Sequence, residues 1–239
     1  MNPEHLPRRV LVTGGGTGIG LAIVQALREH GREVVAVGRR LEPLKAAQKY
    51  GASICQWDVC HDADGLLNAV GPLDGLVHNA GRYQHGSIGQ WNEDDWYQTW
   101  RTNTLAPALL SQAFARRLQG AGAIVAVAST LALRPAPGLA AYACSKAAMV
   151  ALVKSLALEL APAGIRVNAV SPGVVPTDMT VAPREDRTEA EQKAAFAALH
   201  PLGRMGTPEE VAQTVLLGLG NQWMTGTNLV IDGGLLNRE

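Results

Sequence analysis

The chain has 239 residues, 47% of them apolar, and its 21 basic residues balance its 21 acidic residues. The length suits one large α/β domain of ordinary globular composition. The absence of a positive excess argues against nucleic acid or an anionic membrane as the main partner. No apolar stretch approaches the roughly 20 residues of a membrane-spanning helix, and the polar residues 1–9 contain no signal core. We therefore expect a soluble, cytoplasmic protein.

Short β-branched runs alternate with longer helical patterns along the chain. These patterns predict strands at 9–13, 33–37, 53–57, 74–78, 123–129, 165–170 and 229–232, and helices at 17–30, 41–50, 63–70, 93–118 and 139–160. Pro107 lies inside the fourth helix and predicts a kink or a break there. Repeated strand–helix–strand units predict right-handed crossovers. We therefore expect one α/β domain over residues 1–239, a doubly wound parallel sheet of about seven strands with helices on both faces.

The segment from residue 172 to about 207 breaks this alternation, with mixed charge and several prolines. A long insertion after the carboxyl end of a parallel strand borders the ligand crevice of such folds. We therefore expect a substrate lid at about 174–207. The alternative is a peripheral surface excursion.

A glycine-rich turn follows the first predicted strand and reads Thr-Gly-Gly-Gly-Thr-Gly-Ile-Gly over residues 13–20. A turn of this kind brings free backbone N–H groups and the positive end of a helix next to a phosphate. Glycine is needed where a side chain would block a pyrophosphate. The turn therefore predicts a phosphate-bearing cofactor, although such loops also occur as plain strand–helix turns.

The end of the second predicted strand indicates which nicotinamide cofactor binds. NAD sites usually place a carboxylate there for the ribose 2′-hydroxyl, but this strand runs into Arg39 and Arg40, with no carboxylate before Glu42. A guanidinium suits a 2′-phosphate through its charge and its forked donors. We therefore favour NADP(H), with NAD(H) as the other option, and expect Arg39 as the main anchor and Arg40 as the second. The alternative is a surface arginine pair.

Tyr142 and Lys146 are one helical turn apart, and Ser129 precedes the tyrosine by 13 residues. A free phenol has a pKa of about 10 and is a poor base at neutral pH. A nearby ammonium favours the phenolate by charge attraction, and the i, i+4 spacing lets both groups share one helix face. We therefore expect Tyr142 to act as general acid or base on a carbonyl or alcohol, with Ser129 binding the substrate oxygen. Taken singly, each residue could be an ordinary structural one.

These motifs together resemble the short-chain dehydrogenase/reductase family over nearly the whole chain. The resemblance implies a Rossmann-like fold and a catalytic set of Asn103, Ser129, Tyr142 and Lys146. It also implies cofactor contacts from Gly14, Thr17, Gly18, Ile19, Gly20, Asp58, Val59, Asn79, Ala80, Gly81, Tyr142, Lys146, Pro172, Gly173, Val175 and Thr177. Within this family Lys146 is expected to reach the nicotinamide ribose, and Asn103 to anchor a water linking Lys146 to solvent. His78 departs from the pattern, because the family usually has asparagine there.

In its details the sequence is similar to small tetrameric carbonyl and sugar reductases and to 3-oxoacyl-carrier-protein reductases of this family. This resemblance implies an oxidoreductase that transfers a hydride between NADP(H) and a carbonyl or secondary alcohol, as a homotetramer or homodimer. We expect no metal ion, because the three cysteines and six histidines form no ligand cluster. The segments around Arg82, Tyr83, His85, Leu131, Arg134 and Val175 should border the substrate. Two alternatives remain: a nicotinamide-binding sensor or scaffold without turnover, and a sugar-nucleotide epimerase or dehydratase.

Overall fold

The computed structural model describes residues 3–177, 180 and 188–238. Seven parallel strands form one sheet in the order β3-β2-β1-β4-β5-β6-β7. The strands are β1 (Arg9–Thr13), β2 (Glu33–Gly38), β3 (Ser53–Gln56), β4 (Gly75–His78), β5 (Gly122–Val127), β6 (Ile165–Pro172) and β7 (Asn228–Ile231). The doubly wound parallel sheet predicted from the sequence is therefore confirmed.

The strand order reverses between β1 and β4. Strands β2 and β3 continue from one side of β1, and β4 to β7 from the other, so that Val10 pairs with Gly75 across the reversal. At such a point the two connections leave in opposite directions and open a crevice beyond the carboxyl ends of the strands. The glycine-rich turn follows β1 and therefore lies at this crevice.

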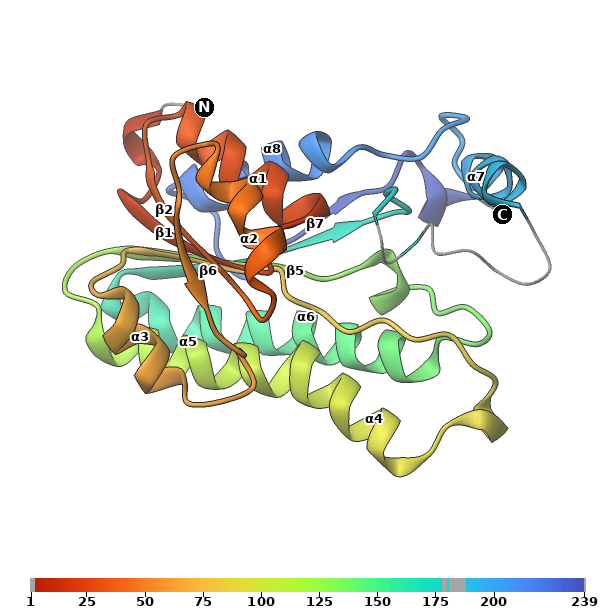
Figure 1. Ribbon diagram of the computed structural model, residues 1–239, viewed down its shortest axis with the longest axis horizontal. Coiled ribbons are helices and arrows are strands. Elements are labelled where there is room, and N and C mark those ends of the chain that lie inside the picture. The colour runs from red at the N-terminus through yellow and green to blue at the C-terminus, as the bar shows by residue number, and fades with distance from the viewer. Residues whose placement is uncertain (1–2, 178–179, 181–187, 239) are drawn as a thin grey trace.

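Helices cover both faces of the sheet (Figure 1). The first face carries α1 (Gly18–Glu29), α2 (Leu41–Gln48) and α8 (Pro208–Gly220), and the second carries α3 (Ala63–Val70), α5 (Ala106–Arg117) and α6 (Ala140–Leu160). One apolar cluster fills each interface, with Ile23 and Leu219 fully buried on the first face and Leu110 and Met149 on the second. The sheet is thus covered on both faces, as the nearly continuous apolar strands require.

The long helix predicted at 93–118 is interrupted, as Pro107 indicated, but the interruption begins before the proline. Helix α4 (Glu93–Trp100) runs into a π-helical segment, Arg101–Leu105, and α5 then begins at Ala106. Proline has no N–H to donate to the carbonyl four residues earlier, which is that of Asn103. The wider π turn shifts the register at this position, and the N–H of Ala106 donates to the carbonyl of Arg101 instead.

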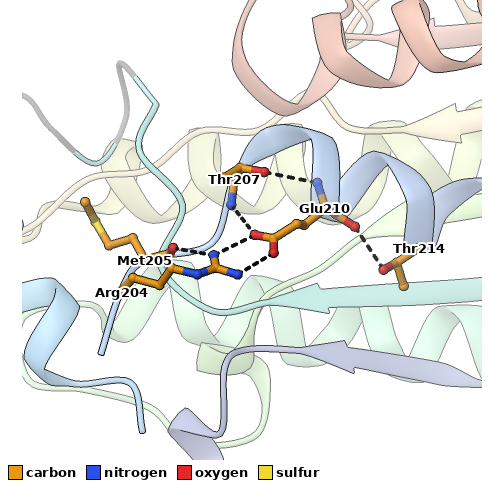
Figure 2. Close-up of polar contacts among 5 residues, drawn as sticks. All are labelled: Arg204, Met205, Thr207, Glu210 and Thr214. Atoms are coloured by element: carbon orange, nitrogen blue, oxygen red, sulfur yellow. Dashed lines mark hydrogen bonds and ion pairs between the residues drawn. The ribbon is translucent and has the colours of Figure 1, made fainter. Parts of the chain in front are cut away.

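Helix α8 was not among the predicted helices, although its start has a clear local signal. Figure 2 shows Thr207 and Glu210 in a reciprocal capping box: the backbone N–H of Thr207 donates to the Glu210 carboxylate, and the N–H of Glu210 donates to the Thr207 hydroxyl. Pro208 occupies the first helical position, where no N–H is needed. Arg204 pairs with the same carboxylate, and the hydrogen bond from its guanidinium, followed by the backbone hydrogen bond from Thr207, lowers the pKa of Glu210 to about 2.

The expectation that no segment has the length and apolarity of a membrane span was wrong for α6. Helix α6 and the turn after it, Ala140–Ala163, have a mean hydropathy of 1.4 and sufficient length. The helix packs its buried residues, among them Val150 and Val153, against the second face of the sheet. We therefore interpret it as a core helix, which passes the same test of length and composition.

Candidate active site

A cleft of about 850 Å³ opens at the carboxyl edge of the strands. Its wall includes most of the residues that the sequence singled out: Gly14, Thr17, Gly18, Ile19, Gly20, Arg40, Asn79, Ala80, Gly81, Ser129, Tyr142, Lys146, Pro172, Gly173, Val175 and Thr177. These residues come from the ends of β1, β4, β5 and β6 and from the beginnings of α1 and α6. The fold thus gathers side chains that lie up to 163 positions apart in the sequence.

The glycine-rich turn is packed too tightly for side chains at several positions. Gly14 and Gly18 have φ angles of +65° and +49°, which favour glycine. A Cβ at Gly20 would collide with the carbonyl oxygen of Gly14. Helix α1 begins here, and Thr17 at its N-cap makes no side-chain capping bond. The first N–H groups of the helix are therefore left for another acceptor at the cleft wall, which fits the pyrophosphate of a dinucleotide.

Thr13 and Asn79 hold the glycine-rich turn against the end of β4. The hydroxyl oxygen of Thr13 accepts hydrogen bonds from the backbone N–H groups of Asn79 (3.0 Å) and Ala80 (3.1 Å). The side-chain amide of Asn79 donates back to the carbonyl oxygens of Thr13 and Gly14, at 3.1 Å each. This reciprocal network fixes both sides of the crevice, and Thr13 is the member whose role the sequence analysis missed.

Ser129, Tyr142 and Lys146 come together in the middle of the cleft. Ser129 follows β5 and caps a short 3-10 helix, and its Oγ accepts a hydrogen bond from the N–H of Leu131. The same side chain is hydrogen-bonded to Tyr142. The Nζ atom of Lys146 lies 5.7 Å from the centre of the Tyr142 ring. All three side chains are at least nine-tenths buried.

The acidity of Tyr142 differs from the sequence-based expectation. Burial raises the pKa of Tyr142 to about 12, with a smaller opposing effect from the Ser129 hydrogen bond and a further rise from Tyr83. Burial also lowers the pKa of Lys146 to about 8. The sequence-based expectation that Lys146 lowers the phenol pKa is therefore wrong for the protein alone, because desolvation disfavours the charged form of both groups and Lys146 is not among the causes of the shift. Tyr142 is a neutral proton donor at neutral pH.

Asn103 is fully buried behind the cleft and does not form part of its wall. Its side-chain oxygen accepts from the N–H of Arg82 at 2.7 Å, and its amide donates to the Arg82 carbonyl and to the hydroxyl of Ser145, each at 2.9 Å. Ser145 directly precedes Lys146 in α6. The side chain of Asn103 thus connects the π-helical segment to the loop after β4 and to α6. It is linked to Lys146 only indirectly, through Ser145.

Three predicted cofactor contacts, Arg39, Asp58 and Val59, also lie outside the cleft wall. Arg39 and Arg40 are both exposed, but only Arg40, the N-cap residue of α2, reaches the wall. The Asp58 carboxylate accepts from the N–H of Cys60, so it caps the following turn, the local role available to an aspartate at this position.

Two segments late in the chain also contribute to the cleft wall. Phe196 and Leu199 come from α7 (Glu189–Ala198) and the residue after it, inside the segment expected to form a lid, of which residues 178–179 and 181–187 lie outside the described residues. Leu235, Leu236 and Arg238 come from the turn after β7. No local sequence pattern predicts these individual contacts, because they depend on how distant segments pack.

His78 occupies a buried position at the end of β4, where the resemblance leads one to expect asparagine. Its Nε2 atom lies 2.8 Å from the hydroxyl of Ser111 in α5. Burial, and secondly the charge of Lys146, lower the pKa of His78 to about 3. The ring is therefore neutral and serves as a hydrogen-bonding partner in the core.

Comparison with known proteins gives matches over nearly the whole chain. The family described as enoyl-(acyl carrier protein) reductase matches residues 14–236. The chain is 36% identical to the 3-oxoacyl-[acyl-carrier-protein] reductase FabG of Chlamydia pneumoniae, over 95% of this chain and 96% of that protein. It is 33% identical to the L-xylulose reductase of Caenorhabditis elegans, over 99% and 98%. A crystal structure of an actinorhodin polyketide ketoreductase variant with NADPH superposes with a TM-score of 0.90 at 33% identity, covering 97% of this chain and 98% of that one.

Proposed function

We propose that this chain, which belongs to the short-chain dehydrogenase/reductase family of NAD(P)-dependent oxidoreductases, reduces a carbonyl group to a secondary alcohol with NADP(H). The observation that carries the proposal is the meeting of Ser129, Tyr142 and Lys146 in one cleft with the glycine-rich turn. This arrangement combines a dinucleotide-binding turn with a buried proton donor beside a hydroxyl and an amine. Each part of the arrangement has a role in carbonyl reduction.

The residues of the cleft fit a nicotinamide dinucleotide. The N–H groups at the start of α1 would hold the pyrophosphate, and the loop of Pro172, Gly173 and Thr177 would border the nicotinamide. Arg40 supplies the positive charge for a 2′-phosphate, and it replaces Arg39 as the first candidate because it reaches the cleft wall. Relatives named as reductases and the neighbour solved with NADPH support the choice of NADP(H) over NAD(H). When bound, the reduced nicotinamide supplies the hydride.

The protein's part in the reaction is to orient the carbonyl and to supply a proton. Ser129 donates a hydrogen bond to the substrate oxygen and keeps it beside the phenol. Tyr142 transfers its phenolic proton to that oxygen as negative charge develops on it. Lys146 contributes a nearby positive charge and hydrogen-bond donors for the cofactor ribose, and Asn103 positions the first turns of α6 through Ser145.

The direction of the reaction agrees with the protonation state of Tyr142. A phenol with a pKa of about 12 is protonated at neutral pH and is ready to act as an acid. Alcohol oxidation would instead require the phenolate. That form becomes populated only as the pH rises toward this pKa, so oxidation should become efficient only at alkaline pH.

We also propose that the chain forms a homotetramer in the cytoplasm. The exposed large apolar side chains include two groups on neighbouring elements: Tyr97, Trp100, Leu105 and Leu109 around α4 and α5, and Leu217, Trp223 and Val230 around α8 and β7. Two distinct self-complementary patches produce a tetramer with two kinds of two-fold interface. The segment at about 174–207 would close over bound substrate from the side of α7.

The decisive experiment replaces Tyr142 with phenylalanine. We expect Tyr142→Phe to lose carbonyl reduction by about 1,000-fold or more, because the proton donor is removed, while NADPH still binds. Oxidation of NADPH is followed by absorbance over a panel of ketones and aldehydes, and cofactor binding by calorimetry. Tyr50→Phe, an exposed tyrosine after α2, is the matched control. Rates like those of the unmodified protein in Tyr142→Phe would refute the mechanism, and cofactor binding without turnover of any substrate would instead support a sensor.

A further inference from the structure

The cleft wall contains two exposed arginines that are linked through a backbone carbonyl. Arg134 and Arg238 both belong to the cleft wall and both are exposed. They are 104 positions apart in the sequence, but the guanidinium of Arg134 donates a 2.7 Å hydrogen bond to the backbone carbonyl of Arg238. The guanidinium of Arg238 in turn donates to the carbonyl of Ala198 at the end of α7. Figure 1 shows the turn after β7 beside α7.

The segments that carry these arginines are held by further hydrogen bonds. Arg134 lies just after the 3-10 helix that Ser129 caps, and its N–H donates to the carbonyl of Thr130. The Asp232 carboxylate accepts from the N–H groups of Gly234 and Leu236, which fixes the turn leading to Arg238. The two guanidinium groups therefore project from an ordered wall.

All the charged side chains of the cleft wall, among the residues that the structure describes, are basic. Its charged members are Arg40, Arg134, Lys146 and Arg238, and it contains no aspartate or glutamate. Arg40 lies on the side of the glycine-rich turn, and Lys146 lies beside Tyr142. Arg134 and Arg238 have no carboxylate partner among the described residues. Their donors satisfy backbone carbonyls, and no carboxylate of a described residue pairs with either guanidinium.

The surroundings of the two arginines are apolar. The same cleft wall includes the apolar residues Leu131, Pro135, Ala136, Leu139, Phe196, Leu199, Leu235 and Leu236. A cleft lined in this way accepts the hydrocarbon part of a ligand, and the low-dielectric wall concentrates the field of the arginines. Guanidinium groups bind carboxylates and phosphates with paired donors.

We propose that Arg134 and Arg238 form a subsite for an oxyanion, so that the physiological substrate is a ketone or aldehyde whose far end bears a carboxylate or a phosphate. This inference rests on the proposed function, because it names the class of substrate that the same cleft reduces. The carbonyl lies at Ser129 and Tyr142, the chain of the substrate crosses the apolar wall, and its anionic end meets the two guanidinium groups.

The kinetic test compares matched substrates that differ only at the far end: medium-chain oxo-carboxylates, their methyl esters, and the same ketones ending in a phosphate monoester. We expect kcat/KM to be about 10-fold or more higher for an anionic substrate than for its ester, the scale of one charge-assisted hydrogen bond. The preference should shrink as salt is added, because the arginines are exposed. The better of the carboxylate and phosphate series identifies which oxyanion the subsite takes.

Two substitutions, Arg134→Gln and Arg238→Gln, remove the charges and keep a polar amide. The glutamine side chain is shorter than the guanidinium that donates to the carbonyl, so the neutral ester series shows any effect that does not depend on charge. We expect the ratio of kcat/KM for the anion to that for the ester to fall about 10-fold in each variant. Arg116→Gln, on the surface of α5 next to Asp64, is the control and should keep the ratio. Equal kcat/KM values for anion and ester in the unmodified protein, or an unchanged ratio in both glutamine variants, would overturn the subsite.

A binding measurement separates the failure of this inference from the failure of the proposed function. Calorimetry compares hexanoate and hexyl phosphate with hexanol, in the unmodified protein and in Arg134→Gln. If the unmodified protein binds an anion more tightly than hexanol and Arg134→Gln loses this preference, the subsite is supported. This holds even if no ketone is reduced, because failure of reduction contradicts only the proposed reductase function. Equal binding of anion and alcohol rejects the subsite.

Discussion

The ammonium nitrogen of Lys146 lies 2.6 Å from the carbonyl oxygen of Val127, the last residue of β5. Ser129 follows two residues later, so the end of one strand sets the positions of both the lysine and the serine. The carbonyl stabilises the charged amine, but burial dominates and lowers the pKa of Lys146 to about 8. The lysine therefore titrates close to physiological pH.

We expect carbonyl reduction to depend on this titration. The value of kcat/KM should be level up to about pH 8 and then fall as Lys146 loses its proton, because its positive charge and one of its donor hydrogens are lost. The phenol of Tyr142 stays protonated over the same range. A pH profile with buffers of constant ionic strength measures the effect. A profile that stays level to about pH 9.5 would contradict the assignment of the break to Lys146.

The two arginines after β2 should differ in their effect on cofactor preference. Arg40→Asp should lower the ratio of kcat/KM with NADPH to that with NADH by about 10- to 100-fold, because a charge-assisted contact is replaced by repulsion. Arg39→Asp is the matched control, with the same charge change one residue away and outside the cleft wall, and its effect should be clearly smaller. If Arg39→Asp has the larger effect, the sequence-based order of the two residues is restored.

The glycine at position 20 should tolerate no side chain. A methyl group there would meet the carbonyl of Gly14 and the amide of Asn79, so Gly20→Ala must displace the turn or the start of α1. We expect the affinity for NADPH to fall at least about 10-fold, because a displaced turn no longer presents its N–H groups to the phosphates. Gly89→Ala, where a Cβ would meet nothing within 4 Å, should bind NADPH normally. Calorimetry on both variants tests the difference, and equal affinities would contradict the role of the turn.

His78 should make the fold sensitive to acid. The pKa of its ring is lowered to about 3 from 6.5, so between these values the unfolded chain holds a proton that the folded chain does not. Its contribution to stability is therefore present above about pH 6.5 and is lost as the pH falls toward 3, by up to about 1.4 kcal/mol per pH unit. In His78→Asn this part of the slope should disappear. Urea unfolding of both proteins between pH 4 and 8 measures it, and parallel curves would contradict the interpretation.

The sequence was sufficient for those parts of the molecule that local chemistry determines. Apolar runs located the seven strands, and the spacing of Tyr142 and Lys146 identified a shared helix face. The family match agrees with the enzyme class inferred from these residues. Pro107 indicated the interruption of the long helix, but the π turn around Asn103 depends on which hydrogen bonds the surrounding helix can rearrange, and the sequence pattern does not contain that information.

The outer cleft could not be predicted, because it depends on contacts between distant segments. Arg134 was expected near the substrate, but nothing in the sequence indicated that Arg238 would lie beside it. The sequence analysis ranked Arg39 before Arg40, but only Arg40 reaches the cleft wall, because this depends on how the chain turns from β2 into α2. The burial that governs the acidity of Tyr142 is likewise a property of the packed cleft.

The C-terminal turn, with Leu235, Leu236 and Arg238 in the cleft wall, has a practical consequence. It is an economical target for enzyme engineers: randomising the codons for Leu235, Leu236 and Arg238 would vary substrate selectivity while leaving the sheet and the proton donor intact.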